Sequence, residues 1–217
     1  MKKIIYRTLE KKDYPQICKM ICTAFGLNSY VSDSKTLALV NKHYLCSCLA
    51  EQTYSCVAEI DGQIVGVIMG ASKHDTHTVI NVISTLQYIF YTLQIMLFHR
   101  KACCGKDNTH QAYEALLHDR KELYDGVLTL FIVQKNYRGQ GIGKSLLNGL
   151  QMYWKAQGTN RSYLYTDDTC NYGFYEHMGF SRADERTVDI FRNGQKDTLD
   201  VYLYDYQTNT VQQNQLE

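Results

Sequence analysis

The sequence has very little proline and no excess of charge of either sign. One proline, Pro15, and 14 glycines occur in 217 residues, which excludes the collagen-like and proline-rich disordered classes. Lysine and arginine number 23 against 22 aspartate and glutamate, and no long basic run occurs. We therefore expect neither nucleic acid nor an anionic membrane as a partner. Hydrophobic residues make up 45% of the chain, enough for the core of one domain.

Targeting and disulfide signals are also lacking. The chain starts Met-Lys-Lys-Ile-Ile-Tyr-Arg without a signal-peptide core, so we expect a cytoplasmic protein whose eight cysteines are free thiols. Two groups of His and Cys could be considered as metal ligands: His99, Cys103, Cys104 and His110, or His43, Cys46 and Cys48. Neither has the C-x2-C spacing that presents two thiolates to one zinc ion, so we expect no metal.

The longest uncharged run, residues 78–98, is long enough to cross a bilayer as a helix. Polar residues interrupt it, and several of them (Asn81, Ser84, Thr85, Tyr88 and Thr92) fall three or four apart. This spacing predicts a mildly polar stripe on a helix that is otherwise apolar. We expect the helix to be covered, either as the interface of a homodimer or as a hydrophobic wall over a substrate cleft, rather than to span a membrane.

Apolar periodicity and turn residues predict the order of the elements. Strands are expected over residues 3–7, 54–60, 63–69, 127–133, 163–166, 188–192 and 199–206. Helices are expected over residues 13–25, 34–49, 78–98, 110–123, 142–154 and 171–178, with a polar loop over 101–109. Asp61-Gly62 and Asn193-Gly194 predict two tight hairpins. This order indicates a mixed α/β or α+β domain.

A glycine-rich loop follows the buried strand 127–133. It reads Arg138-Gly139-Gln140-Gly141-Ile142-Gly143-Lys144 and leads into an amphipathic helix. Glycines allow close approach of a ligand, and the unpaired N–H groups of a helix start bind anions such as phosphate. A dinucleotide fingerprint would require glycine at Lys144 or Leu146, and a P-loop would require it at Arg138. The loop therefore fits neither motif. The pattern that it does contain is R-x-x-G-x-G, formed by Arg138, Gly141 and Gly143.

A second motif lies one predicted strand downstream, Asn171-Tyr172-Gly173-Phe174-Tyr175-Glu176-His177-Met178-Gly179-Phe180. The two segments together resemble the coenzyme A pyrophosphate loop and the N-x-x-x-Y-x-x-x-G-F segment of the GCN5-related N-acetyltransferase (GNAT) family. The specific motifs lie between Leu128 and Phe180. A glycine turn into a packed helix, with Tyr175 as a core residue, is the structural alternative.

The resemblance implies an acyl-CoA N-acyltransferase fold, in which helices flank a central, mixed, mostly antiparallel sheet. We expect one domain over residues 1–206. The stretch 72–125 is longer than the usual link between the third and fourth strands of the family, and we expect it to be a helical insertion. Residues 207–217 form a polar tail. The family does not account for the insertion.

The resemblance also implies roles for individual residues toward acetyl-CoA. Backbone groups of Phe131, Ile132 and Val133 would pair with the pantetheine arm. The N–H groups of Gly139, Gln140, Gly141, Ile142, Gly143 and Lys144 would hold the pyrophosphate, with Arg138 opening that loop. Tyr175 would protonate the departing thiolate, a role that suits a phenol with an ordinary pKa of about 10. Asn171 would bind the cofactor arm or order the helix start.

The general base is not identified by the sequence. Many family members place a glutamate on the fourth strand, roughly where Thr129 stands. The alternatives are Glu59, Asp125, Asp167 and Asp168. Each could instead be a solvated acid or a helix cap.

The leading hypothesis is an N-acetyltransferase that moves the acetyl group of acetyl-CoA to a primary amine of a small molecule, by direct attack. Two alternatives stay open. One is acetylation of a protein N-terminus or lysine, and the other is a CoA-binding sensor that has lost catalysis.

Overall fold

A seven-stranded sheet forms the centre of the protein in the computed structural model, which describes residues 3–75, 79–98, 106–192 and 195–208. The strands are β1 Ile5–Arg7, β2 Tyr54–Ile60, β3 Gln63–Ser72, β4 Gly126–Val133, β5 Arg161–Asp167, β6 Ser181–Arg192 and β7 Gln195–Gln207. Their order in the sheet is β1-β2-β3-β4-β5-β7-β6. Neighbouring strands run antiparallel except β4 and β5, which are parallel.

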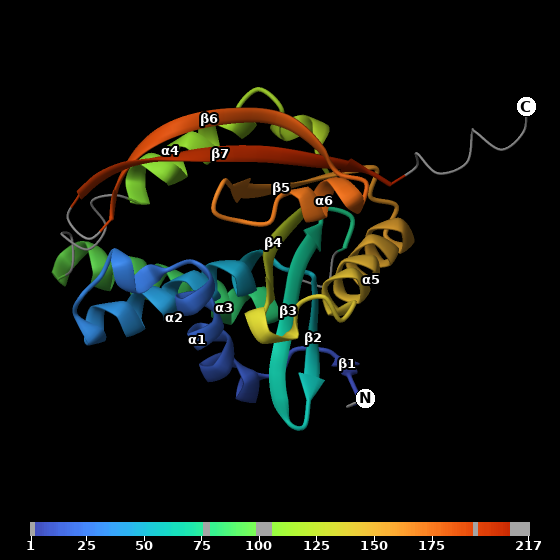
Figure 1. The fold of residues 1–217 in the computed structure, drawn as a ribbon, viewed down its shortest axis with the longest axis horizontal. Helices are drawn as coiled ribbons and strands as arrows, with labels where there is room; N and C mark the ends of the chain where they lie inside the picture. Colours follow the sequence, from blue (N-terminus) through green and yellow to red (C-terminus); the bar gives the residue numbers. More distant parts are fainter. Residues whose placement is uncertain (1–2, 76–78, 99–105, 193–194, 209–217) are drawn as a thin grey trace, which may run out of the picture.

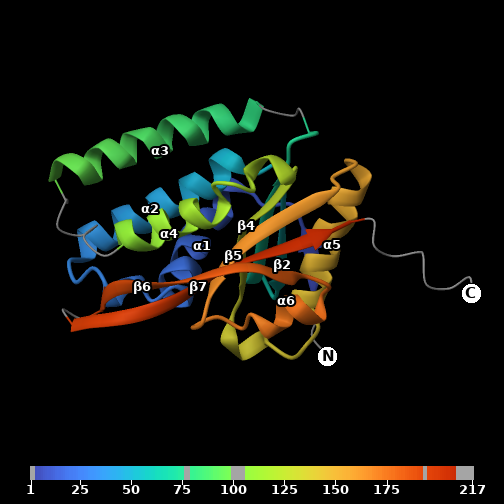
Figure 2. The same cartoon turned by 90° about the horizontal axis from the view of Figure 1, so that it is seen from above.

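Helices cover both faces of this sheet (Figures 1 and 2). They are α1 Tyr14–Ala24, α2 Ser34–Glu51, α3 Val79–Phe98, α4 Lys106–Leu117, α5 Ile142–Ala156 and α6 Gly173–His177. Along the chain, α3 and α4 come between the third and fourth strands. The predicted fold class and the helical insertion are therefore confirmed.

Each face of the sheet has its own hydrophobic core. On one face, Ile17 and Ile21 of α1 and Leu49 of α2 pack against β3 and β4. On the other, α5 buries Leu146 and Leu150 against β3, β4 and β5. Strands covered on both faces read as nearly continuous apolar runs, which is why β3 and β4 could be predicted from the sequence.

The insertion and the last hairpin differ from the sequence predictions. The predicted loop 101–109 is wrong over 106–109, where α4 has already begun, and α4 ends at Leu117 rather than at 123. Ala112 and Leu116 pack on β6 and β7, and this tertiary contact fixes the helix. β6 begins at Ser181, seven residues before the predicted start, and β7 continues to Gln207. The predicted Asn193-Gly194 turn lies outside the described residues.

α3 lies alongside α2 (Figure 2), and polar side chains of the two helices are in contact. His43 Nε2 of α2 lies 3.0 Å from Thr92 Oγ1, and the Cys46 thiol donates to Gln87. Nine large apolar side chains of α3 are 48–74% exposed: Val82, Ile83, Leu86, Ile89, Phe90, Leu93, Met96, Leu97 and Phe98. Within its own chain, then, α3 is not the covered helix that the sequence predicts. Among the described residues, no helix meets the length and hydropathy required to cross a membrane.

Two glycines of β3, Gly66 and Gly70, let α5 lie close to the sheet. A Cβ at Gly70 would stand 2.7 Å from Leu150 Cδ1 and 2.8 Å from the carbonyl oxygen of Val127. The second contact is with backbone, which cannot turn away. We expect Gly70→Ala to lower the free energy of unfolding by about 1–3 kcal/mol, as overpacking does.

Urea denaturation measures this loss. Gly173→Ala is the matched control, because no atom lies within 4 Å of the Cβ it would add. Equal unfolding midpoints for the two variants would contradict the close contact between α5 and β3.

Candidate active site

The parallel strands β4 and β5 separate soon after they meet. Their pairing runs over Gly126–Leu128 and Ser162–Leu164 and ends there. β4 stays paired with β3 as far as Val133, and β5 stays paired with β7 as far as Asp167. Each strand is thus held on its outer side only. The facing backbone groups beyond Leu128 and Leu164 are free to pair with a ligand.

A β-bulge lies where the two strands separate. Gly70 of β3 pairs with Leu128 and Met69 pairs with Leu130, so Thr129 is the extra residue of β4. Thr129 and Tyr165 directly follow the last parallel pair. Both carry buried hydroxyls without a hydrogen-bond partner. Each buried hydroxyl without a partner is a candidate contact for a polar group.

The glycine loop joins the end of β4 to α5. Gly139 and Gly141 have φ of 77° and 78°, and no atom lies within 4 Å of the Cβ that either would carry. The loop is therefore an open cradle. Hydrogen bonding of α5 begins with the N–H of Ser145, which donates to the carbonyl of Gly141. Arg138 donates from Nε to the carbonyl of Val133, 3.1 Å away, and so ties the loop to β4.

The cradle suits a phosphate group because the first N–H groups of a helix lack intrahelical partners and carry partial positive charge. The predicted residues of the loop, from Arg138 to Lys144, thus lie together beside Phe131, Ile132 and Val133 at the end of β4. The residues present fit the pyrophosphate and pantetheine arm of acetyl-CoA at the level of backbone geometry.

Tyr175 lies on α6 within a cluster of aromatic rings. Its ring centroid is 6.2 Å from that of Phe131 and 5.8 Å from that of Phe174. Burial raises the pKa of the Tyr175 phenol well above its usual range, and the charges of Cys170 and Asp167 raise it further. Tyr175 is therefore a protonated phenol next to the end of β4.

Asn171 directly precedes this helical turn. Its backbone carbonyl accepts from the N–H of Phe174, 3.2 Å away, and the residue is exposed. Tyr172 is the N-cap residue of α6 and makes no side-chain cap, so the role of Asn171 stays a prediction.

Two of the four candidate bases have structural roles elsewhere. Glu59 accepts from Arg7 Nε at 2.8 Å. Asp125 accepts from the N–H groups of Asn160 and Arg161 at the opposite end of β4, and these bonds lower its pKa even though burial opposes the shift.

The other two lie at the end of β5, where Asp167 is the last residue of the strand and Asp168 follows it. Asp167 accepts from the N–H of Thr169 at 2.9 Å, and its charge acts on Tyr175. Asp168 is exposed. Of the four, Asp167 is the carboxylate whose charge acts on the Tyr175 phenol.

A group of tyrosines near this gap was not predicted as part of the site. Tyr113 of α4 stacks on Tyr165 of β5, with centroids 4.5 Å apart, and Tyr175 is among the groups that raise the pKa of Tyr44 of α2. Burial raises the pKa of all three phenols. They stay protonated at neutral pH and can donate hydrogen bonds. They come from α2, the insertion and β5, so no sequence spacing could have revealed the group.

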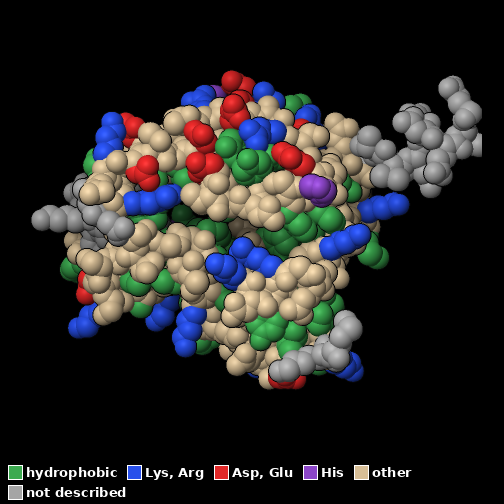
Figure 3. Space-filling view, in the orientation of Figure 1, with side chains coloured by type: hydrophobic (Ala, Val, Ile, Leu, Met, Phe, Trp, Pro, Cys, Tyr) green, Lys and Arg blue, Asp and Glu red, His purple; other side chains and the backbone are tan. Residues whose placement is uncertain are grey.

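The β6–β7 hairpin lies above a hollow in the surface (Figure 3). Arg192 at its far end donates from Nε to the hydroxyl of Tyr30, 3.0 Å away, on the segment before α2. Asn108 of α4 donates to the carbonyl of Asp189 on β6, at 2.9 Å. The hairpin is thus bonded both to the segment before α2 and to α4. These contacts limit access to the hollow from the end of the hairpin at Arg192.

The two groups of predicted metal-ligand alternatives do not form a site in the described residues. His99, Cys103 and Cys104 lie outside them. His43, Cys46 and Cys48 contact Thr92, Gln87 and the carbonyl of Thr129, respectively. No group of three His, Cys, Asp or Glu that could hold a metal occurs among the residues described.

Solved structures share this architecture. An N-acetyltransferase from Staphylococcus aureus Mu50 aligns over 95% of this chain and 99% of its own, with a TM-score of 0.54 and 14% identity. The ribosomal-protein-S18-alanine N-acetyltransferase from Escherichia coli aligns over 98% of both chains, with a TM-score of 0.51 and 14% identity. Ard1 from Thermoplasma volcanium aligns over 94% of this chain and 97% of its own, with a TM-score of 0.51 and 14% identity. At these identities the likeness shows the fold.

Sequence comparison adds a family-model match over part of the chain. No curated protein is similar enough in sequence to match the chain. Residues 101–182, which hold β4, the glycine loop and Tyr175, match the family model described as the acetyltransferase (GNAT) domain. The predicted resemblance is therefore confirmed: the chain has the GNAT fold and matches the GNAT acetyltransferase domain over residues 101–182.

Proposed function

We propose that the protein is an N-acetyltransferase that transfers the acetyl group of acetyl-CoA to a primary amine of a small molecule. The observation that carries this proposal is the separation of β4 and β5 beside an open, glycine-lined helix start. The match to the GNAT acetyltransferase domain supports the same reaction class.

In this proposal backbone groups hold acetyl-CoA. The N–H and carbonyl groups of Phe131, Ile132 and Val133 would pair with the pantetheine arm in the gap. The N–H groups from Gly139 to Lys144 would hold the pyrophosphate. A backbone N–H of β4 near the bulge at Thr129 would stabilise negative charge that develops on the thioester oxygen.

In the same proposal, side chains orient the amine and transfer protons. The unpartnered hydroxyls of Thr129 and Tyr165 would orient the attacking amine, which must be neutral to act as a nucleophile. The Tyr175 phenol, protonated at neutral pH, would donate its proton to the departing thiolate. Asp167 is our candidate for accepting the proton of the amine through water.

The tied-down hairpin favours a small acceptor. Because Arg192 contacts Tyr30 and Asn108 contacts Asp189, a chain segment of another protein has less room to enter from the far end. The tyrosines around the gap would contact a slender organic amine. Acetylation of a protein N-terminus or lysine remains the alternative, since solved structures with this fold include an alanine N-acetyltransferase for ribosomal protein S18.

Release of free CoA from acetyl-CoA, measured over a panel of amines, tests the function. We expect release with at least one small primary amine and none with N-terminal peptides or lysine peptides. Peptide-dependent release alone would favour the protein acetyltransferase. Binding of acetyl-CoA without release across the panel would favour the sensor that has lost catalysis.

The position of the pyrophosphate is tested by Gly141→Asp. The substitution adds a side chain and a negative charge to the open cradle, so we expect at least a 100-fold loss of acetyl-CoA affinity in equilibrium dialysis. Gly158→Asp is the matched control, because Gly158 has a similar φ of 72°, no atom within 4 Å of its Cβ, and a place at the other end of α5. Equal affinity of the two variants would contradict the assignment.

The proposed acid is tested by Tyr175→Phe. The phenylalanine keeps the ring contacts with Phe131 and Phe174 and removes only the proton donor. We expect kcat to fall by about 100-fold, the usual scale of general acid catalysis, while affinity for acetyl-CoA stays within about twofold. Unchanged kcat would remove Tyr175 from this role.

We also propose that the exposed face of α3 is the interface of a homodimer. Apart from Ile83, which lines a cavity with residues of α1 and α2, its eight exposed apolar side chains at on the order of 100 Å² each match the about 800 Å² that each partner of a stable dimer buries. This is larger than the apolar patches usual on monomers. The described part of α3 carries no charge, so two copies can pack there without like-charge repulsion.

Light scattering measures this association. We expect a dimer for the unmodified protein and a monomer for Leu93→Glu. Met152→Glu is the control, since Met152 is 72% exposed on α5, away from this face. A monomeric unmodified protein, or a dimer that survives Leu93→Glu, would contradict the proposal.

A further inference from the structure

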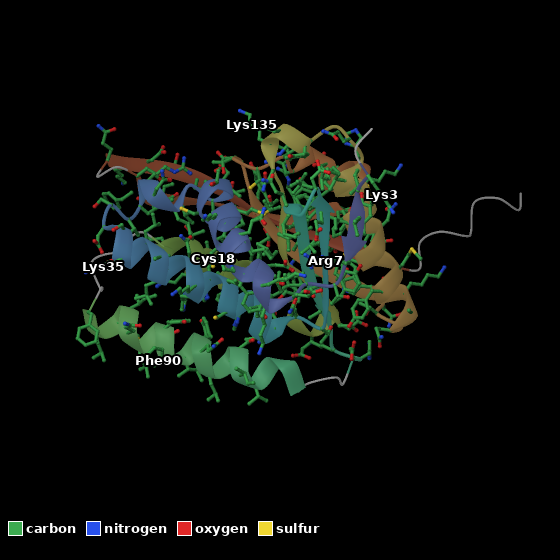
Figure 4. All side chains as sticks on the ribbon, turned by 90° about the horizontal axis from the view of Figure 1, so that it is seen from below. Lys3, Arg7, Cys18, Lys35, Phe90 and Lys135 are labelled. Carbon is green, nitrogen blue, oxygen red and sulfur yellow. The ribbon has the colours of Figure 1, made fainter. Side chains whose placement is uncertain are left out.

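A cavity of about 920 Å³ is lined by residues of α1, α2 and α3 and by Lys11, which precedes α1. Figure 4 shows the three helices together, with Cys18 on α1 and Phe90 on α3. None of the residues proposed above for acetyl-CoA or the amine lines it. The cavity is therefore separate from the gap between β4 and β5.

The size of the cavity fits a small molecule better than a segment of another protein. Sixteen of the described residues line it. A stable protein interface takes about 20–30 residues from each side, whereas small-molecule sites have volumes of about 300–1,000 Å³. On α1 the lining positions recur every three or four residues from Tyr14 to Thr23, so the cavity follows one face of this helix along most of its length. Such a shape suits an elongated molecule.

The walls of the cavity are largely apolar. They include Pro15 of α1, Leu45 of α2, and Ile83 and Tyr91 of α3. Ile83 is 59% exposed although it lines the cavity. A hydrocarbon that covers it removes apolar surface from water, which is the main source of affinity in sites of this kind.

Two thiols in the walls, those of Cys18 and Cys46, are neutral and already bonded. Burial raises the pKa of Cys18 to about 11 and also raises that of Cys46. Cys18 donates to the backbone carbonyl of Asn41, and Cys46 donates to Gln87. Neutral thiols behave as small apolar groups rather than as nucleophiles or metal ligands, so they extend the surface that suits a hydrocarbon chain.

The rim of the cavity carries positive charge without matching negative charge. Lys11, Lys19 and Lys42 line the cavity and are exposed, and no acidic residue is among the described residues that line it. The ion pairs of the described residues include none of these three lysines. The charge of Lys42 acts on the interior, because it opposes the rise that burial causes in the pKa of Cys18 and of Cys46. An anionic group at the mouth of the cavity is therefore attracted to Lys42.

We propose that this cavity binds a single-chain fatty acid as its carboxylate. The hydrocarbon chain lies along α1 between the three helices. The carboxylate, which is ionised at neutral pH, pairs with Lys42, and Lys11 and Lys19 add to the positive potential around it. A fatty acid combines the two properties that the cavity selects, one elongated apolar chain and one negative charge. The proposal does not depend on the transferase function.

Three probes test it by calorimetry, all kept below their micelle concentrations. Decanoate carries both the chain and the negative charge. Propanoate keeps the charge with a short chain, and decyltrimethylammonium keeps the chain with the opposite charge. We expect saturable one-site binding of decanoate and at least tenfold weaker binding of the other two. Absence of saturable binding of decanoate, or equal affinity for decanoate and either of the other probes, would overturn the proposal.

Variants place decanoate in the cavity. Ala38→Trp, which adds a large ring to an exposed lining position, should abolish its binding. Lys42→Glu should weaken the binding of decanoate about tenfold and strengthen that of decyltrimethylammonium. Lys35→Glu is the matched control, because Lys35 is an exposed lysine of α2 outside the cavity, and it should leave both affinities within about twofold.

The lysine pair keeps the test valid even where Ala38→Trp does not fold. Equal affinities of Lys42→Glu and Lys35→Glu for decanoate would overturn the proposal, as would unchanged binding in a folded Ala38→Trp variant. Binding of decanoate by Leu93→Glu but not by the unmodified protein would mean that a second copy of the chain covers the cavity, and it would overturn the proposal as well.

Discussion

The separation of β4 from β5 is the constraint on which the rest of the structure depends. The two strands pair over only three residues each, yet each remains bonded to its other neighbour, β3 or β7, over most of its length. The gap is therefore held open by two intact antiparallel ladders rather than by a flexible loop. Backbone groups in such a gap are fixed before a ligand arrives, which lowers the ordering cost of binding.

The second constraint is the distance between α5 and the sheet. Gly66 and Gly70 of β3 leave room for Leu146 and Leu150, and Trp154 donates from its indole N–H to the carbonyl of Ala71, 2.9 Å away. These contacts fix the axis of α5, and with it the helix start at Gly141. The open cradle of the glycine loop lies beside the end of β4 because a packed helix holds it there.

The sequence predicted this part of the molecule well because its signals are local. The limits of β2 and of the Asp61-Gly62 turn agree with the structure, since strand and turn preferences coincide there. The glycine loop and the Tyr175 segment are continuous in the sequence, so their resemblance to GNAT motifs could be seen there. The limits of α4 could not be predicted, since Ala112 and Leu116 hold this helix against the distant hairpin. The tyrosines around the gap and the exposed face of α3 likewise depend on contacts between segments far apart in the chain.

Calorimetric titration with acetyl-CoA tests the central claim most directly, with NAD and ATP as controls for the other nucleotides that a glycine loop can bind. The account predicts saturable binding of acetyl-CoA at one site per chain and none of NAD or ATP. Absence of acetyl-CoA binding, or equal binding of all three nucleotides, would contradict the claim that the gap between β4 and β5 and the adjoining cradle form an acetyl-CoA site.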